Sequence, residues 1–145
     1  MWLLSKNKKK FLLTLSLFLL TSCTGGSVVY KSQSLAIQSP VPVTAEVSKE
    51  LADSVRLERI VVIPKGDNYI IQLTLRNFSD NPLNVIYKVE LYNSEGLKVD
   101  FLTSKWTTLE LDSNGERVVK VVVPKRVVGK LSSVKIFVRT FERGG

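Results

Sequence analysis

The sequence predicts an all-β fold, an antiparallel β-sandwich of about seven strands that occupies residues 55–145. Apolar and polar residues alternate with a period of two in several segments after Val55. Turn sequences rich in Ser, Asn, Asp and Gly recur about every ten to twelve residues. No long segment has the period of a helix, so the crossover helices that a parallel sheet needs are missing. These observations favour strands joined by short turns over an α/β fold.

Residues 23–54 are expected to form a tether that leads into an edge strand and a short helix. Gly, Ser and Gln are frequent at the start of this segment, as in flexible linkers. Pro40 and Pro42 interrupt the apolar residues that follow, and a strand tolerates proline at a sheet edge. The apolar residues of the expected edge strand are Leu35, Ile37, Val41, Val43 and Val47. Helix-forming residues from 47 to 54 predict one or two helical turns.

Two strands between Tyr69 and Asn93 have the clearest alternation. The first, YIIQLTLRNF, is expected to bury Tyr69, Ile71, Leu73 and Leu75. After the turn SDNP, the second, LNVIYKVELYN, is expected to bury Leu83, Val85, Tyr87, Val89 and Leu91. We expect the side chain of Asn77 to cap the turn between the strands. The hydroxyl of Tyr87 should be hydrogen-bonded to the backbone because the ring is expected to be buried.

Four more segments complete the predicted sheets. The turn Ser94–Glu95–Gly96, with Gly96 as a structural residue, leads into a shorter strand from Leu97 to Thr103. A strand from Trp106 to Leu111 is followed by the turn DSNG and the strand ERVVKVVV. The last strand is expected between Val134 and Phe141. Trp106 follows a loop, where its ring could be a platform for a ligand; the structural interpretation, a core residue that closes one end of the sandwich, is the one we expect.

Residues 1–22 have the three parts of a lipoprotein signal peptide. Four lysines lie within the first ten residues, an apolar run spans Phe11–Leu20, and small residues precede Cys23. A ten-residue helix rises about 15 Å, roughly half the thickness of a hydrocarbon core, so a stable membrane span is not expected. The residues Leu20-Thr21-Ser22-Cys23 resemble the bacterial lipobox.

The resemblance to the lipobox implies that Cys23 is a membrane anchor. In proteins with this box the thiol receives a diacylglyceryl group, the signal peptidase cuts just before the Cys, and the new amino terminus is acylated. Several acyl chains hold a protein firmly at a membrane. An incidental or buried Cys is the alternative, and it would leave a lone thiol in an oxidising compartment. Thr24 replaces the Asp commonly associated with inner-membrane retention, which implies the outer membrane, with the domain facing the periplasm.

A series of short motifs runs through the sandwich region from roughly Leu51 to Arg139. They are LTLRN, Pro82-Leu83, Val85-x-Tyr87, Leu91-Tyr92-x-x-x-Gly96, Trp106 before a Leu-x-Leu strand, and Gly115-Glu116. In this order they resemble the YcfL-type family of bacterial lipoproteins. The chain lacks that family's Ala-Pro pair near Val123-Pro124 and has a longer segment before the last strand.

The family resemblance implies an immunoglobulin-like sandwich on a lipid tether in a Gram-negative envelope, with no assigned enzymatic activity. Members are often encoded near a lipoprotein that activates a peptidoglycan synthase, which implies a link to the cell wall.

The positive charge of the chain does not indicate nucleic acid. The formal net charge is +8, but Lys6, Lys8, Lys9 and Lys10 belong to the signal peptide. Of the 21 Lys and Arg residues, 17 therefore remain from Cys23 onward against 13 Asp and Glu, a surplus of four. These residues are scattered, which is typical of a solvated surface.

The residues available for catalysis are few, and we expect no enzymatic activity, no cofactor and no metal. The chain has no histidine, the commonest general base and metal ligand near neutral pH. Glu110 and Asp112 lie two residues apart on one strand face and could bind a cation or serve as acid and base. The simpler interpretation is that they form the solvent face opposite Leu109 and Leu111.

The outward faces of the predicted strands provide the functional hypothesis. Aromatic and basic side chains alternate with core residues and would form a patch for an acidic protein, an anionic glycan or a lipid headgroup. The patch residues are Arg76, Lys88, Tyr92, Lys135, Phe137, Arg139 and Phe141, with Ile70 and Ile86. Residues 24–54 could instead cover this surface, or a one-residue bulge could reverse the faces.

Two functional classes follow from the sequence. The first is a lipid-anchored, periplasm-facing module that binds or assembles envelope proteins or peptidoglycan without catalysis. The second is an envelope hydrolase or a cation-dependent enzyme that uses carboxylates such as Glu110 and Asp112.

Overall fold

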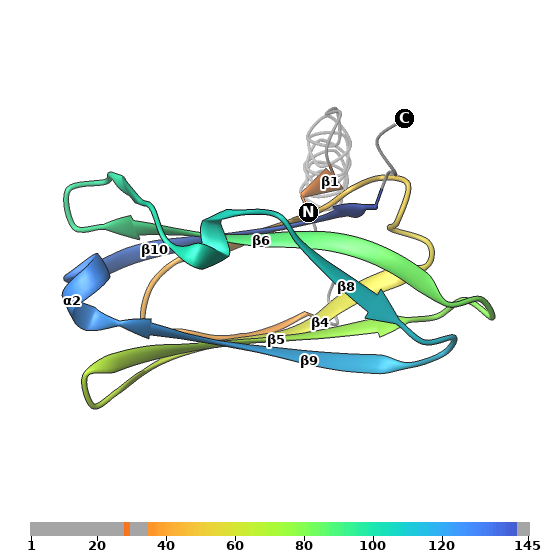
Figure 1. The fold of residues 1–145 in the computed structure, drawn as a ribbon, viewed down its shortest axis with the longest axis horizontal. Helices are drawn as coiled ribbons and strands as arrows, with labels where there is room; N and C mark the ends of the chain where they lie inside the picture. Colours follow the sequence, from red (N-terminus) through yellow and green to blue (C-terminus); the bar gives the residue numbers. More distant parts are fainter. Residues whose placement is uncertain (1–27, 30–34, 142–145) are drawn as a thin grey trace, which may run out of the picture.

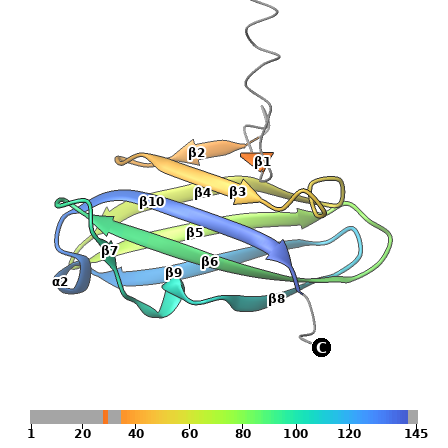
Figure 2. The same cartoon turned by 90° about the horizontal axis from the view of Figure 1, so that it is seen from above.

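The computed structural model describes residues 28–29 and 35–141. In this part of the chain ten strands form two sheets that pack face to face (Figures 1 and 2). Seven of the ten strands have five or more residues. The predicted β-sandwich is therefore confirmed. The predicted signal peptide and Cys23 lie outside the described residues.

The four-stranded sheet, sheet B, contains strands β2 (Ala36–Gln38), β4 (Val55–Lys65), β5 (Asn68–Asn77) and β9 (Glu116–Pro124). Its strand order is β2-β4-β5-β9. The β4 and β5 strands form an antiparallel hairpin, and β9 pairs antiparallel with β5. The short strand β2 pairs parallel to β4, so sheet B is mixed rather than purely antiparallel.

The six-stranded sheet, sheet A, carries the surface that matters below. Its strands are β1 (Val28–Val29), β3 (Val43–Val47), β6 (Leu83–Asn93), β7 (Lys98–Val99), β8 (Thr107–Leu111) and β10 (Leu131–Thr140). The order is β1-β3-β10-β6, and both β7 and β8 pair with β6. The β3 strand runs parallel to β10, and the other pairs are antiparallel. Sheet A is therefore also mixed.

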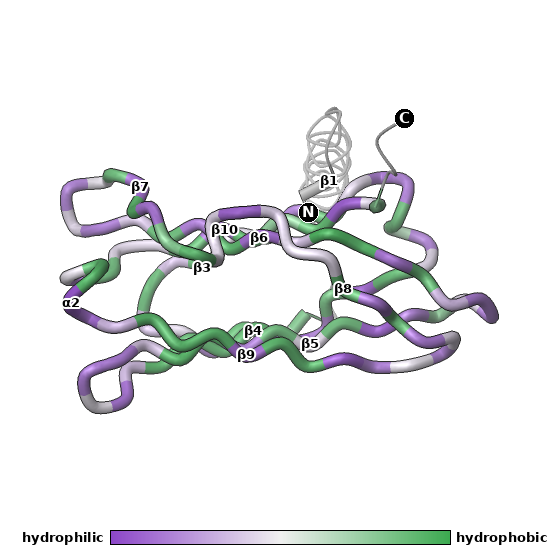
Figure 3. The backbone as a smooth tube through the Cα atoms, in the orientation of Figure 1, coloured by the Kyte–Doolittle hydropathy of each residue, from purple (hydrophilic) through white to green (hydrophobic). Residues whose placement is uncertain are grey.

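The core lies between the sheets and consists of the inward-facing aliphatic residues of both. Figure 3 shows how hydrophobic and hydrophilic residues follow one another along the strands. In β5, Ile71, Leu73 and Leu75 are fully buried, as the alternation predicts. The β4 strand switches its buried positions from odd to even numbers, since Leu57 and Ile60 are both buried. A bulge between Leu57 and Arg59 adds the extra residue and restores the inward direction.

The segment predicted as one edge strand is divided between the two sheets. Residues 36–38 form β2 at the edge of sheet B, and residues 43–47 form β3 in sheet A. Pro40 and Pro42 lie in the connection, where the backbone leaves one sheet and joins the other. The prolines therefore mark a crossing between layers.

Two predicted elements differ from the structure. The short helix expected at 47–54 is a series of turns, in which Ser54 and Val55 both donate backbone hydrogen bonds to the carbonyl of Leu51. Leu51 is buried and packs in the core, which holds these turns against the sandwich. The strand expected at 97–103 is limited to β7, and a 3-10 helix, η2 (Leu102–Ser104), follows it.

The connection from β9 to β10 is a single helical turn, α2 (Lys125–Val128). It ends at Gly129, whose φ of 66° favours glycine. Within the described ranges, no helix is long and apolar enough to cross a membrane.

Candidate functional site

The outer face of sheet A carries a cluster of cations and aromatic rings on three neighbouring strands. We call it the cation–aromatic face and define it by Lys88, Tyr92, Trp106, Lys135, Phe137 and Arg139. Register brings these residues together, since Phe137 of β10 lies opposite Lys88 of β6. Tyr87 of β6 lies opposite Thr107 of β8, so the neighbouring residues Lys88 and Trp106 share the outer side of the sheet. Sheet pairing therefore unites residues that are far apart in sequence.

Trp106 is at the centre of one half of this face. Its ring meets the ring of Phe137 edge to face, with centroids 6.5 Å apart and an angle of 70°. The Lys88 ammonium lies 4.8 Å from the Trp106 ring centroid and 5.0 Å from that of Phe137. The Arg139 guanidinium lies 4.8 Å from the Trp106 centroid. Two cations are therefore held against one aromatic pair.

Tyr92 is at the centre of the other half. The Lys135 ammonium lies 4.9 Å from its ring centroid, and its hydroxyl donates a 3.1 Å hydrogen bond to Glu90. Lys88 and Lys98 form ion pairs with the same carboxylate at 3.3 and 3.6 Å. Glu90 thus connects the two halves through Lys88.

The protonation of Glu90 and Tyr92 reflects this network. Burial alone would raise the pKa of Glu90, but hydrogen bonds from Lys88 and Tyr92 and the charges of Lys88 and Lys98 hold it below its usual value. Burial, the hydrogen bond to Glu90 and the charge of Glu90 all raise the pKa of Tyr92. Glu90 therefore stays ionised at neutral pH and Tyr92 stays neutral.

The residues of the predicted patch are divided between the two sheets. Lys88, Tyr92, Lys135, Phe137 and Arg139 share the outer face of sheet A, and Phe141 is exposed directly after β10. Arg76 instead lies on β5 in the other sheet, between the carboxylates of Glu58 and Glu116. Ile70 also belongs to β5. Alternation along a strand predicts a face, but it does not predict which of two sheets holds the strand.

Arg76 has a structural role in sheet B. Hydrogen bonds to Glu58 and Glu116 raise its pKa, and its guanidinium lies 5.9 Å from the ring centroid of Phe78. Arg56 lies 4.8 Å from the same centroid. Because two carboxylates neutralise Arg76, this cluster presents less free positive charge than the cation–aromatic face.

The prediction that Trp106 closes one end of the core is wrong. The residue is 37% exposed and belongs to the outer surface. It precedes β8, one residue out of phase with the buried Leu109 and Leu111, so its side chain points away from the core.

Tyr87 is half-buried against the core, and burial raises its pKa, although the charge of Arg117 acts in the opposite direction. Among the described residues its hydroxyl has no backbone partner.

Asn77 and Gly96 stabilise turns away from the site. The Asn77 side chain is fully buried and accepts hydrogen bonds from the backbone amide and hydroxyl of Ser79 at 2.9 and 2.8 Å. Its amide nitrogen donates to the carbonyls of Asn81 and Asp112 at 2.8 and 3.0 Å. Gly96 has a φ of 78° in the turn after β6, a conformation that favours glycine.

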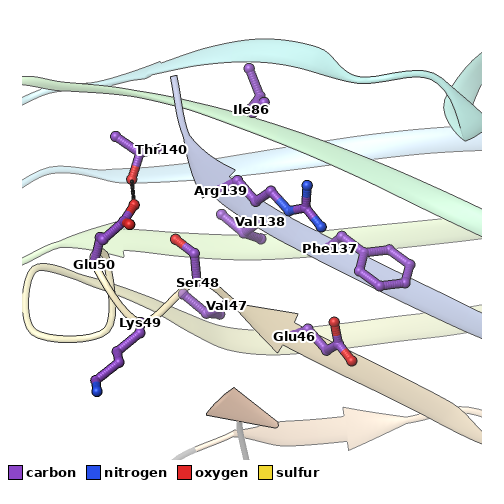
Figure 4. Close-up of a pocket in the computed structure, with 10 residues that line it drawn as sticks. All are labelled: Glu46, Val47, Ser48, Lys49, Glu50, Ile86, Phe137, Val138, Arg139 and Thr140. Carbon is purple, nitrogen blue, oxygen red and sulfur yellow. Dashed lines mark hydrogen bonds between the residues drawn. The ribbon is translucent and has the colours of Figure 1, made fainter. Parts of the chain in front are cut away.

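A pocket of about 460 Å³ adjoins the cation–aromatic face at the end of β3 and β10 (Figure 4). Phe137, Arg139 and Ile86 line the side next to that face. The carboxylates of Glu46 and Glu50 line the other side, together with Lys49, and Thr140 donates a hydrogen bond to Glu50 at 3.3 Å. The hydroxyl of Ser48, which also lines the pocket, is buried without a hydrogen-bond partner in the described structure.

The carboxylates considered for catalysis, Glu110 and Asp112, are not among the residues of the cation–aromatic face. Glu110 and Asp112 are exposed, whereas Leu109 and Leu111 between and beside them are buried, which matches the solvent-face interpretation. Within residues 28–29 and 35–141, no three His, Cys, Asp or Glu side chains are grouped so that they could hold a metal ion.

Sequence reasoning missed three features of the site. Glu90 was not assigned to the patch, although its even number places it on the same face as Lys88 and Tyr92. Trp106 has the same parity as Glu110, which would have placed it outside. The pocket depends on how the loop after β3 lies beside β10, and no local pattern in the sequence contains that information.

Fold and site together define a β-sandwich protein with a cation–aromatic sheet face. The family model described as "Protein of unknown function (DUF1425)" matches residues 43–139, so the chain belongs to this family. No curated protein matches the chain.

Two solved structures resemble the fold. A DUF1425 family member from Shewanella sp. pv-4 has a TM-score of 0.54 and 15% identity and covers 83% of this chain and 100% of its own. Campylobacter jejuni cj0090 has a TM-score of 0.44 and 16% identity over 76% of this chain and 100% of its own.

Proposed function

We propose that this protein is a lipid-anchored module of the cell envelope that faces the periplasm and acts by binding, without catalysis. The cation–aromatic face is the observation that carries this proposal. Lys135 and Arg139 contact aromatic rings and, among the described residues, have no carboxylate within ion-pair distance. Their positive charge is therefore available to an anionic component of the envelope.

The lipobox-like sequence at Leu20–Cys23 supports the anchor, and Thr24 supports the outer membrane as the location. The family resemblance supports a link to peptidoglycan synthesis, since YcfL-type proteins are often encoded near an activator of a peptidoglycan synthase. On this proposal the anchor sets the location of the domain, and the face of sheet A selects what it binds.

Photo-crosslinking in cells tests whether the face makes contact with the envelope. Thr108 is exposed on β8, opposite Ile86 of β6, and lies two residues from Trp106 on the same face. A photoreactive amino acid at Thr108 should form adducts with an envelope protein, glycan or lipid. The matched control is Lys120, an exposed position on β9 of sheet B.

Adducts at position 108 that disappear when Lys135 and Arg139 are both replaced by Glu would support the proposal. Adducts of equal yield at positions 108 and 120, or none at position 108, would contradict it.

A further inference from the structure

We propose that the cation–aromatic face lies on the anionic headgroup layer of the membrane in which Cys23 is anchored. This inference rests on the lipid anchor of the proposed function and names the occupant of the face. In this orientation the rings of Trp106 and Phe137 reach the interface, and Lys135 and Arg139 pair with lipid phosphates.

The length of the chain restricts how far sheet A can lie from the anchor. Cys23 lies five residues before Val28, the first residue of β1. Five residues span at most about 18 Å when fully extended. Because β1 pairs with β3 in sheet A, the edge of this sheet must stay within about 18 Å of the acylated residue. The domain is thus held at the membrane surface by a short connection.

The cation–aromatic face lies close to that attached edge. The strand order places β10 two strands from β1 and β6 three strands from it. With neighbouring strands about 4.8 Å apart, the face begins about 10 Å from β1. A sheet attached so near its edge can lie against the membrane with this face.

Charge distinguishes the outer face of sheet A from that of sheet B. On sheet A, Lys135 and Arg139 have no carboxylate partner among the described residues, and they lie against rings. On the strands of sheet B, Arg76 is held between two carboxylates, and Arg56 is the one described cation that lies against a ring without an ion pair. Anionic lipid attracts free cations near its surface, and aromatic rings favour the interface between headgroups and acyl chains. Sheet A, with two such cations and with the strand nearest the anchor, therefore fits anionic lipid better than sheet B.

The neighbouring pocket does not compete for the same anion. Glu46 and Glu50 line it together with Lys49 and Arg139, so the two carboxylates offset the attraction of these cations for a phosphate inside the pocket. The ring of Trp106 is already in contact with Lys88, Arg139 and Phe137, so it is not an open platform for a sugar ring. The cation–aromatic face therefore fits a layer of many lipid phosphates better than a single ligand bound in a pocket.

Tryptophan fluorescence provides the test. The chain has two tryptophans, and Trp2 belongs to the signal peptide that is removed before Cys23, so Trp106 is the single tryptophan of the lipidated protein. The protein is reconstituted into vesicles of phosphatidylethanolamine and phosphatidylglycerol, with or without bromine on the acyl chains. We expect brominated lipid to quench Trp106 in these vesicles and to quench it much less in phosphatidylcholine vesicles.

Charge variants show whether the quenching depends on the cations of the face. Each neutralised cation should lower the ratio of docked to undocked domain about fivefold. Lys135→Gln with Arg139→Gln should therefore reduce quenching strongly, whereas Lys120→Gln on the outer face of sheet B should not. Because all three positions are exposed, the substitutions should leave the domain folded. Equal melting temperatures of the wild type and the variants would verify this.

Flotation of the vesicles separates the two proposals. Protein that floats with the vesicles while Trp106 is not quenched, or is quenched equally in all variants, would overturn docking and leave the anchor intact. A change in Trp106 fluorescence that occurs only after addition of peptidoglycan fragments or an acidic protein, and not with anionic vesicles, would also overturn lipid docking. Protein that does not float would overturn the anchor and, with it, both proposals.

Discussion

Asn77 is fully buried, and both ends of its side-chain amide are hydrogen-bonded. Its oxygen accepts from Ser79, and its nitrogen donates to carbonyls of the SDNP turn and of the segment that joins β8 to β9. One side chain therefore forms hydrogen bonds to two turns that are far apart in sequence. The local Asn-x-Ser pattern predicts the first contact, because Asn commonly hydrogen-bonds the backbone two residues on. The second contact depends on the packing of the sheets.

The substitution Asn77→Ala should lower the free energy of unfolding by about 3 kcal/mol, because it leaves buried backbone groups without partners. Urea denaturation of the purified protein measures this change. Asn81→Ala is the control, since the Asn81 side chain is exposed and should change stability by less than about 0.5 kcal/mol. Equal effects of the two substitutions would contradict the role of Asn77.

Glu90 makes stability depend on acid pH. Its pKa in the folded state lies below its usual value of about 4.3. A depressed carboxyl pKa stabilises the folded state above the pKa of the unfolded state, and this contribution is lost as pH falls through the folded pKa. The ion pairs with Lys88 and Lys98 therefore stabilise the domain at neutral pH and weaken in acid.

Glu90→Gln should lower stability by about 1 kcal/mol at pH 7 and have a progressively smaller effect in acid, as the pH falls through the lowered folded-state pKa of Glu90. Urea denaturation at several pH values gives the comparison. Glu95→Gln, at an exposed turn position, is the matched control. A difference that stays constant from pH 7 to pH 3 would show that charge is not the cause.

At the scale of elements, alternation predicts four of the five strands of nine or more residues and does not single out β4, whose bulge interrupts the period. Strands β5, β6, β9 and β10 agree with the sequence because each buries one face along nine or more residues. Residues 97–103 contain apolar residues without a sustained period, and only β7 is a strand there. Helix propensity at 47–54 was overridden by tertiary contact, since burial of Leu51 stabilises the turns.

The two strands on either side of Pro40 and Pro42 differ in how deeply their side chains are buried. Val47 of β3 is fully buried, whereas Ile37 of β2 is 48% exposed. We expect Val47→Ala to cost about 2 kcal/mol of stability through lost burial and a small cavity. Ile37→Ala should cost less than about 1 kcal/mol. Thermal or urea denaturation of the two variants provides the check, and a larger loss for Ile37→Ala would mean that β2 contributes more to the core than its exposure indicates.

At the scale of the whole molecule, the proposed function makes the location of the domain depend on Cys23. On this proposal the thiol is the site of lipid attachment, so we expect the wild type to incorporate a labelled fatty acid during growth and Cys23→Ala to incorporate none. Gel fluorography of the immunoprecipitated protein measures this incorporation. Ser22→Ala is the control, because another small residue before the Cys should preserve labelling. Label in Cys23→Ala would contradict the anchor.

The sequence by itself determined the β-sandwich and most of its long strands, because alternation of apolar and polar residues is a local property that burial of one face requires. It also determined which outward residues carry charge and aromatic rings. Only the tertiary structure decided that Arg76 belongs to the other sheet and that Glu90 joins the two halves of the face. These facts depend on which strands pair and in what register, and pairing is set by contacts between residues that are distant in the chain.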